Sequence, residues 1–299
     1  MPRSGSTLLQ KLLMSHDKIS SHSEPWFLLN LASLYEFEGT KSKFCYSALR
    51  VAVKDVINSL ENKEKDMLKY IREFSLNIYQ NLSDENSVYF IDKTPRYFFI
   101  IDFIEKVFPE AKFIFLTRNP LETIASYITQ FNYNTIKSFD SYDFDFNEGF
   151  KAIVNGYYKY KNKSILVRYE EIVGEDKEQI IKNIFEYLEL KPDYKVFDKY
   201  QTQDLKGSMG DKNIKKTSSV KKEKDKWKKV IFSNHRKKLL LNILDKIIDD
   251  YYKLSDFNKD DVLNILKSHN TVFNFQDFQD YYLTIVRRDI KNQLGWYKY

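Results

Sequence analysis

The sequence contains little cysteine, glycine or proline, and each shortage narrows what the protein can be. Its 299 residues include a single cysteine, Cys45, which excludes an internal disulfide and any metal cluster held by thiolates alone. A lone thiol is typical of a reducing compartment, so we expect a cytoplasmic protein. Only 8 Gly and 6 Pro are present, and no low-complexity linker or internal repeat divides the chain.

Long apolar runs are also missing. Even the apolar stretch at 97–108 contains Asp102, Glu105 and Lys106, whereas a membrane-spanning helix needs about 18 apolar residues in succession. We therefore expect no membrane span. Hydrophobic residues make up 42% of the chain and charged residues 30%, proportions that exclude disorder over its whole length and favour a globular protein.

Positive charge is concentrated in one segment. The net charge is +6, but residues 212–229 contain nine lysines against Glu223 and Asp225, so this segment carries +7 and the rest of the chain −1. Such a segment is usually a solvated loop or helix face. The alternative is a segment that attracts a polyanion, and the sequence leaves both open.

Short β-prone runs alternate with helical patterns along most of the chain. Continuous β-prone runs predict strands at 88–91, 112–117 and 164–169. Helical patterns lie before and between these strands, at 28–82 with polar interruptions and at 97–108, 121–131 and 149–161. The alternation predicts an α/β fold with a central, mainly parallel sheet whose two faces are covered by helices.

Beyond Lys229 the patterns are helical, at 236–252, 259–268 and 277–294. A chain of this length forms one large domain or two small ones. We therefore expect one domain over 1–230, followed by a C-terminal helical extension over 231–299.

The loop at 2–7, Pro-Arg-Ser-Gly-Ser-Thr, has the composition of an anion-binding loop. Its small residues let backbone N–H groups point inward, and its hydroxyls and Arg3 supply further donors. Leucines at positions 8, 9, 12 and 13 predict a helix that begins at Ser6 and Thr7, with its positive dipole end toward the loop. The loop lacks the Gly-Lys-Ser/Thr of a Walker A motif, and a plain helix cap is the alternative.

A second group of polar residues follows two of the predicted strands. Ligands of parallel α/β sheets bind beyond the carboxyl ends of the strands, and here these ends carry the tetrads at 92–95 and 117–120. Arg118 is followed eight residues later by Ser126, two turns into the next predicted helix. A planar bidentate cation near a hydroxyl suits a terminal phosphate. The alternative is an ion pair between Arg118 and Glu122.

Together these segments resemble the sulfotransferases that use 3′-phosphoadenosine 5′-phosphosulfate (PAPS), a family with carbohydrate, tyrosyl-protein and polyketide-associated members. The loop at 2–9 is similar to the family's 5′-phosphosulfate loop, and 118–126 is similar to its 3′-phosphate motif. Further similar segments lie in the family's order at 92–96, 108–114, 168–173 and 210–211 with Trp227. The resemblance covers Met1 to about Trp227 and implies a P-loop-like α/β domain.

The resemblance implies transfer of a sulfuryl group from PAPS to an acceptor hydroxyl by in-line displacement. Arg3 and Lys93 correspond to the catalytic cations at the leaving oxygen, so no metal ion is required. Tyr169 corresponds to a tyrosine beside the adenine. The full set of cofactor-binding residues implied is Arg3, Ser4, Gly5, Ser6, Thr7, Arg118, Ser126 and Tyr169. No nucleic-acid partner is expected, and the acceptor (saccharide, tyrosine or small metabolite) and the oligomeric state are left open.

The acceptor hydroxyl must lose its proton as it attacks, which requires a carboxylate or a histidine. Related members place a glutamate facing the acceptor just after the first helix, so the resemblance implies that Glu24 is the general base. His22 and His16 are nearby alternatives, and Asp92 is the less favoured carboxylate.

One feature differs from the family pattern, and two other functions remain open. The family has a strand before its phosphosulfate loop, whereas Met1 alone precedes Pro2 here, so we expect a truncated chain or a sheet without that strand. A P-loop phosphotransferase would hold Mg²⁺ with Asp92 and Ser6 or Thr7. A non-catalytic polyanion-binding module would use the lysines of 212–229, and its binding would weaken steeply with salt.

Overall fold

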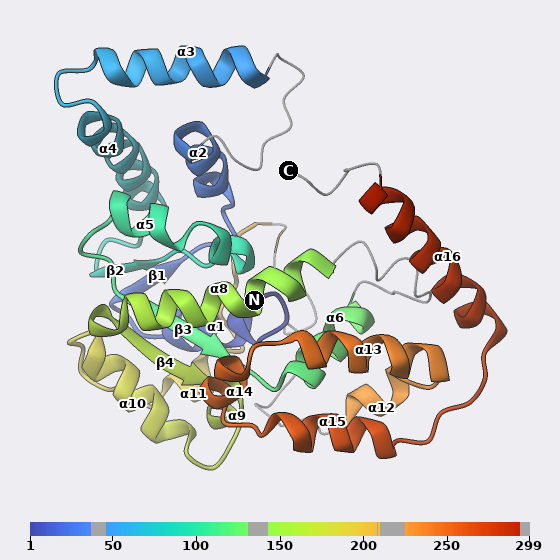
Figure 1. Ribbon diagram of the computed structural model, residues 1–299. Coiled ribbons are helices and arrows are strands. Elements are labelled where there is room, and N and C mark those ends of the chain that lie inside the picture. The colour runs from blue at the N-terminus through green and yellow to red at the C-terminus, as the bar shows by residue number, and fades with distance from the viewer. Residues whose placement is uncertain (37–45, 131–142, 208, 210–224, 294–299) are drawn as a thin grey trace. The chain divides into compact units, whose positions relative to one another are not determined.

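The computed structural model of the protein describes residues 1–36, 46–130, 143–207, 209 and 225–293 (Figure 1). The chain divides into two compact units. Unit 1 comprises Met1–Ser6, Phe113–Tyr187 and Ser219–Tyr299, and unit 2 comprises Thr7–Lys112 and Leu188–Ser218. The boundary between Ser6 and Thr7 falls inside the predicted anion-binding loop.

Unit 2 contains a parallel pair of short strands. β1 (Ile19–Ser21) pairs with β2 (Tyr89–Ile91), and Ser21 lies opposite Ile91 at their carboxyl ends. The helices of this unit are α1 (Ser6–Met14), α2 (Phe27–Glu36), α3 (Tyr46–Ser59), α4 (Glu64–Leu82), the 3₁₀ helix η1 (Pro95–Phe99), α5 (Ile101–Val107) and α11 (Val196–Lys199). Because the strands are parallel and in register, the segments that follow them leave the sheet at the same end.

The core of unit 2 is formed by α2, α4, η1 and α5. Its buried side chains are Leu28, Ala32, Ile71, Tyr97, Ile100, Phe103 and Val107. Phe103 is 0% exposed, and full burial of a side chain of this kind stabilises the fold by about 1.5–3 kcal/mol. This packing holds the segment that follows β2 against the rest of the unit.

Unit 1 contains a second parallel pair. β3 (Phe113–Thr117) pairs with β4 (Ser164–Arg168), and Thr117 lies opposite Arg168 at the carboxyl ends. The chain passes from β3 to β4 through α6 (Pro120–Gln130), α8 (Asp143–Lys159) and the 3₁₀ helix η2 (Lys161–Lys163). The described helices of unit 1 that follow β4 are α9 (Tyr169–Ile172), α10 (Lys177–Tyr187), α12 (Lys226–Val230), α13 (Asn234–Lys246), α14 (Asp249–Ser255), α15 (Lys259–Ser268) and α16 (Phe275–Gln293).

Aromatic side chains fill much of the core of unit 1. The ring centroids of Phe150 and Tyr251 are 4.4 Å apart, and those of Tyr127 and Phe146 are 5.1 Å apart. Both pairs are close to edge-to-face, the arrangement that aromatic quadrupoles favour. These contacts join α8 to α6 and α14, so helices from both sides of β4 in the sequence share one core.

The α/β class, the parallel pairing and the helical C-terminal region are confirmed. The predicted strands at 88–91, 112–117 and 164–169 correspond to β2, β3 and β4. The described strands form two separate two-stranded sheets, and β1 was not predicted because its sequence, Ile-Ser-Ser, contains only one β-prone residue. The division at residue 230 stays a prediction. No helix in the described ranges is both long enough and apolar enough to cross a membrane.

Two predicted helices are divided in the structure. The pattern at 97–108 becomes η1 followed by α5, with Ile100 at φ −126° between them, because Pro95 starts a 3₁₀ turn two residues before the predicted helix. The pattern at 236–252 becomes α13 and α14. Ile247 and Ile248 are extended there, and β-branched residues tolerate that conformation well.

Candidate active site

The carboxyl ends of β3 and β4 bring two of the predicted site residues together in unit 1. Because Thr117 lies opposite Arg168, the residues that follow them, Arg118 and Tyr169, leave the sheet side by side. The guanidinium carbon of Arg118 lies 4.3 Å from the centroid of the Tyr169 ring, which is a close cation–π contact. The predicted placement of Arg118 at a strand end is therefore found.

Arg118 is held by its backbone and by one side-chain nitrogen. The Tyr251 hydroxyl accepts from the Arg118 backbone N–H at 3.3 Å and donates to the Arg118 carbonyl at 3.1 Å. Nη1 of Arg118 donates to the carbonyl of Arg3 at 2.9 Å. Nε of Arg118 is buried and has no hydrogen-bond partner among the described residues. A buried charged donor without an acceptor is costly, and an anion at this place would supply the acceptor.

Ser126 and the loop complete this cluster in unit 1. Nε of Arg3 donates to Oγ of Ser126 at 3.2 Å. The φ angles of Arg3 and Gly5 are 66° and 95°, both in the left-handed region. A Cβ added to Gly5 would lie 2.3 Å from Cδ2 of Tyr169, so only glycine fits against this ring. Arg3 thus contacts both of the other residues, Ser126 through its side chain and Arg118 through its backbone carbonyl.

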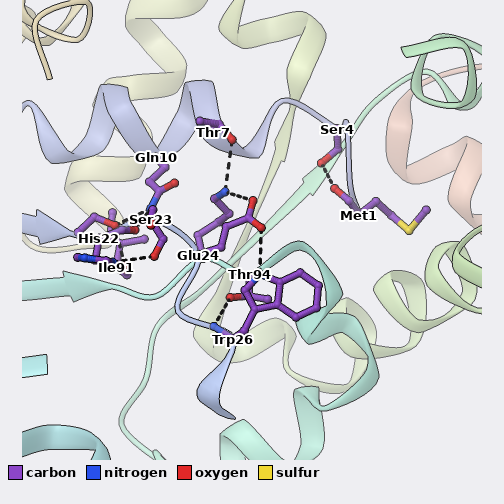
Figure 2. A network of polar contacts seen from close by, with 12 residues as sticks. Met1, Ser4, Thr7, Gln10, His22, Ser23, Glu24, Trp26, Ile91 and Thr94 are labelled. Atoms are coloured by element: carbon purple, nitrogen blue, oxygen red, sulfur yellow. Dashed lines mark hydrogen bonds and ion pairs between the residues drawn. The ribbon is translucent and has the colours of Figure 1, made fainter. Parts of the chain in front are cut away.

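The remaining loop residues have local roles. Oγ of Ser4 is buried and donates to the carbonyl of Met1 at 2.8 Å, which closes the turn (Figure 2). Ser6 is the first residue of α1, so the predicted helix start is confirmed. The first N–H groups of a helix have no acceptor within it, and they present the positive end of the helix dipole.

The carboxyl ends of β1 and β2 bring together the predicted catalytic residues of unit 2. Ser21 lies opposite Ile91, and the chain continues to Glu24 on one side and to Lys93 on the other. Nζ of Lys93 lies 2.7 Å from Oε1 of Glu24 and donates to Oγ1 of Thr7 at 3.3 Å. The side chains of Lys93 and Glu24 are only 12% and 9% exposed, so this ion pair is largely removed from water.

Trp26 also contacts Glu24, which sequence reasoning missed. The indole Nε1 donates to Oε2 of Glu24 at 3.2 Å, so among the described residues each carboxylate oxygen has one donor (Figure 2). The backbone N–H of Trp26 reaches Oγ1 of Thr94 at 3.4 Å. The contact depends on a side-chain rotamer and a positive φ, and neither has a signal in the sequence.

Comparison with known proteins decides the family. A sequence model of the sulfotransferase family matches residues 1–194. The chain belongs to the sulfotransferase family.

Two curated relatives of this sulfotransferase-family chain are longer than it. Nodulation protein NoeE of Sinorhizobium fredii (strain NBRC 101917 / NGR234) is 34% identical over 127 residues, 42% of this chain and 29% of NoeE. An uncharacterized protein of Aquifex aeolicus (strain VF5) is 25% identical over 269 residues, 86% of this chain and 32% of that protein. The chain therefore spans about a third of the length of these relatives.

Solved sulfotransferase domains share the fold. The sulfotransferase domain from the curacin biosynthetic pathway has a TM-score of 0.52 and 16% identity, over 85% of this chain and 93% of that one. The sulfotransferase domain from the Synechococcus PCC 7002 olefin synthase has a TM-score of 0.50 and 18% identity, over 85% and 90%. At such identities the likeness concerns the fold alone.

The two histidines predicted as alternative bases, His16 and His22, have local partners within unit 2 of this sulfotransferase-family chain. Nε2 of His16 lies 3.0 Å from the Lys191 carbonyl, and Nδ1 accepts from the Lys18 backbone N–H at 3.1 Å. Both ring nitrogens of His16 therefore lie within hydrogen-bond distance of main-chain groups. Nδ1 of His22 lies 3.0 Å from the Ser23 carbonyl. A carbonyl only accepts, so Nδ1 of His22 carries the proton.

Asp92 lies in a buried network of its own. The hydroxyls of Tyr79 and Tyr97 donate to its Oδ2 at 2.5 Å and 2.9 Å. Burial raises the pKa of Asp92 to about 6, although these two hydrogen bonds and the charge of Lys93 act to lower it. Burial and the Asp92 charge raise the pKa of Tyr79. Sequence reasoning missed both tyrosines, because they reach Asp92 from α4 and η1.

Other predicted features lie partly or wholly outside the described residues. The segment Gly210–Asp211 and most of the lysine-rich segment at 212–229 are among them. At the described end of that segment, Trp227 is buried, and Lys228 forms an exposed ion pair with Asp225 at 2.9 Å. Burial raises the pKa of Glu122, the predicted alternative partner of Arg118, while the Arg118 charge lowers it.

Proposed function

We propose that this sulfotransferase-family protein transfers a sulfuryl group from PAPS to an acceptor hydroxyl by in-line displacement. The observation that carries the proposal is the cationic cluster of unit 1. Arg3, Arg118 and Ser126 lie together there, and the buried Nε of Arg118 has no acceptor within the described part of the chain. Two guanidinium groups and a hydroxyl suit the oxygens of a phosphate.

The residues present fit PAPS in chemical character. We assign its 3′-phosphate to Arg118 and Ser126, and its adenine to the neighbourhood of Tyr169. We assign its 5′-phosphosulfate to the loop Arg3, Ser4, Gly5, Ser6 and Thr7. The glycine that fits closely against Tyr169 and the helix that begins at Ser6 support this assignment, because both are typical of loops that bind anions through backbone N–H groups.

Glu24 is proposed as the general base and Lys93 and Arg3 as the catalytic cations. When bound, PAPS supplies the sulfuryl group, whose bond to the bridging oxygen breaks as the acceptor oxygen bonds to sulfur, leaving adenosine 3′,5′-bisphosphate (PAP). Glu24 receives the acceptor proton, and the cations stabilise negative charge, which is the largest contribution in reactions of this kind. Nζ of Lys93 lies 2.7 Å from Oε1 of Glu24, so base and cation are ordered by one contact.

The acceptor is proposed to be a saccharide, a tyrosine or a small metabolite. A direct test incubates the protein with ³⁵S-labelled PAPS in excess EDTA, with lactose, a tyrosine-containing acidic peptide and 4-nitrophenol as acceptors. We expect label in at least one acceptor and loss of that transfer in Lys93→Ala. The matched control Lys182→Ala removes one exposed lysine charge from α10 and should retain activity. Strict dependence on Mg²⁺, with turnover of ATP instead of PAPS, would favour a phosphotransferase.

A further inference from the structure

The conformation of Trp26 is unusual and calls for an explanation. Its φ is 61°, a left-handed value that is rare for a bulky aromatic residue and that glycine would adopt freely. Trp26 lies between Pro25 and the start of α2, and its carbonyl accepts from the Leu29 backbone N–H at 3.1 Å. Outliers of this kind persist where the surrounding contacts require them, and they concentrate at functional sites.

The strained backbone places the indole against Glu24. Nε1 of Trp26 donates to Oε2 of Glu24 at 3.2 Å, and Nζ of Lys93 donates to Oε1 at 2.7 Å (Figure 2). Two donors on different oxygens fix the plane of a carboxylate, whereas one donor lets it rotate. Pro25 favours an extended backbone at Glu24, because a residue that precedes proline is disfavoured in the helical region.

The indole orients the carboxylate without adding charge. The indole N–H is a neutral donor, so it fixes the orientation of Oε2 without placing a second positive charge beside Lys93. Tryptophan donates and never accepts, so the direction of this hydrogen bond is fixed. Proton removal depends on a base held in the productive geometry.

We propose that Trp26 is a positioning residue, whose indole N–H holds the carboxylate of Glu24 in the orientation that accepts the acceptor proton. This inference rests on the proposed role of Glu24 as general base. It concerns contacts inside unit 2, among Glu24, Trp26, Lys93 and Thr94. Trp26 acts through Glu24 and itself moves no proton.

The test compares Trp26→Phe with wild type in ³⁵S transfer from PAPS to whichever acceptor of the panel reacts fastest. Phenylalanine keeps an aromatic ring but lacks the N–H donor. We expect kcat to fall about tenfold to a hundredfold, as for loss of a hydrogen bond to a charged group, with KM for PAPS and the melting temperature nearly unchanged. Tyr35→Phe, which removes a hydroxyl bonded to Glu64 from helix α2, just after Trp26 in the chain, should retain the wild-type kcat.

A second pair of variants separates this inference from the proposed function. Glu24→Asp shortens the side chain by one methylene and draws the carboxylate away from the indole, so adding Trp26→Phe should lower kcat no further. An equal loss of kcat in both backgrounds would mean that Trp26 acts independently of Glu24. A wild-type kcat in Trp26→Phe, beside a low kcat in Glu24→Gln, would refute the inference alone. A wild-type kcat in Glu24→Gln would refute the base assignment itself.

Replacement of Trp26 by benzothienylalanine covers the case in which Trp26→Phe fails to fold. Sulfur replaces the N–H in a ring of almost the same shape, so packing is kept while the donor is removed. The same fall in kcat is expected for this variant. A benzothienylalanine variant with the wild-type kcat would show that the ring and not the N–H matters, which contradicts the proposal.

Discussion

Replacement of Arg118 by alanine should remove the preference for ligands that carry a 3′-phosphate. In unit 1 the Arg118 side chain donates to the Arg3 carbonyl, lies over the Tyr169 ring, and has a buried Nε with no acceptor among the described residues. Loss of a hydrogen bond to a charged group costs about 1.5–3 kcal/mol. That range corresponds to a rise in Kd of about tenfold to 150-fold.

The assay is calorimetric titration of wild type and Arg118→Ala with two ligands, PAP and adenosine 5′-monophosphate. The two ligands differ only in the 3′-phosphate, so comparing them isolates the contact with that group. We expect the predicted loss for PAP and nearly unchanged affinity for the monophosphate. Arg118→Lys keeps the charge but lacks the planar fork, so its affinity for PAP should be intermediate.

The free energy of unfolding has to be measured as well as the affinity for PAP, because Arg118 also makes contacts that stabilise the fold. Alanine removes the 2.9 Å hydrogen bond to Arg3 and the cation–π contact with Tyr169, at a cost of about 1–2 kcal/mol in the free energy of unfolding. The wild-type affinity for PAP in a folded Arg118→Ala variant would refute the assignment. An equal loss for both ligands would place Arg118 elsewhere on the nucleotide.

Two further predictions concern the loop and the buried carboxyl. Gly5→Ala should lower the free energy of unfolding by about 1–3 kcal/mol and weaken binding of PAP, because its Cβ would overlap the Tyr169 ring at a φ of 95°. Urea unfolding measures the first effect and calorimetry the second. A variant with unchanged stability and affinity would contradict the close packing of Gly5 against Tyr169. The raised pKa of Asp92, about 6 against 3.8, means that the folded state binds a proton more tightly, so this contribution to stability is complete below pH 3.8 and is lost as the pH rises through 6. The free energy of unfolding should fall by at most about 3 kcal/mol over this pH range, and Asp92→Asn should remove that pH dependence. Urea unfolding of wild type and Asp92→Asn from pH 4 to 7 should therefore give a difference in the free energy of unfolding that changes with pH. A constant difference would contradict the raised pKa.

The parts of the fold that follow from local patterns could be predicted from the sequence. Continuous β-prone runs predicted β2, β3 and β4, and leucine spacing predicted that α1 begins at Ser6. Once the strands were predicted to be parallel, the positions of Arg118 and Lys93 at carboxyl ends followed. β1 could not be found in this way, because three residues form a strand there only through pairing with β2.

Side-chain contacts within the site were harder to predict. The pairing of Glu24 with Lys93 joins segments 69 residues apart, and only the register of β1 and β2 brings them together. The hydrogen bonds from Tyr79 and Tyr97 to Asp92 depend on how α4 and η1 pack. The sequence contains 22 tyrosines, so residue type could not single out these two.

Sulfuryl transfer assisted by Glu24 is tested most directly by following both products of one reaction. PAP and the sulfated acceptor are quantified together in excess EDTA, for wild type and for Glu24→Gln. We predict equal amounts of the two products from wild type, and a kcat about a hundredfold to ten-thousandfold lower for Glu24→Gln at nearly unchanged affinity for PAP. PAP released with free sulfate and no sulfated acceptor, or a folded Glu24→Gln with the wild-type kcat, would contradict the account.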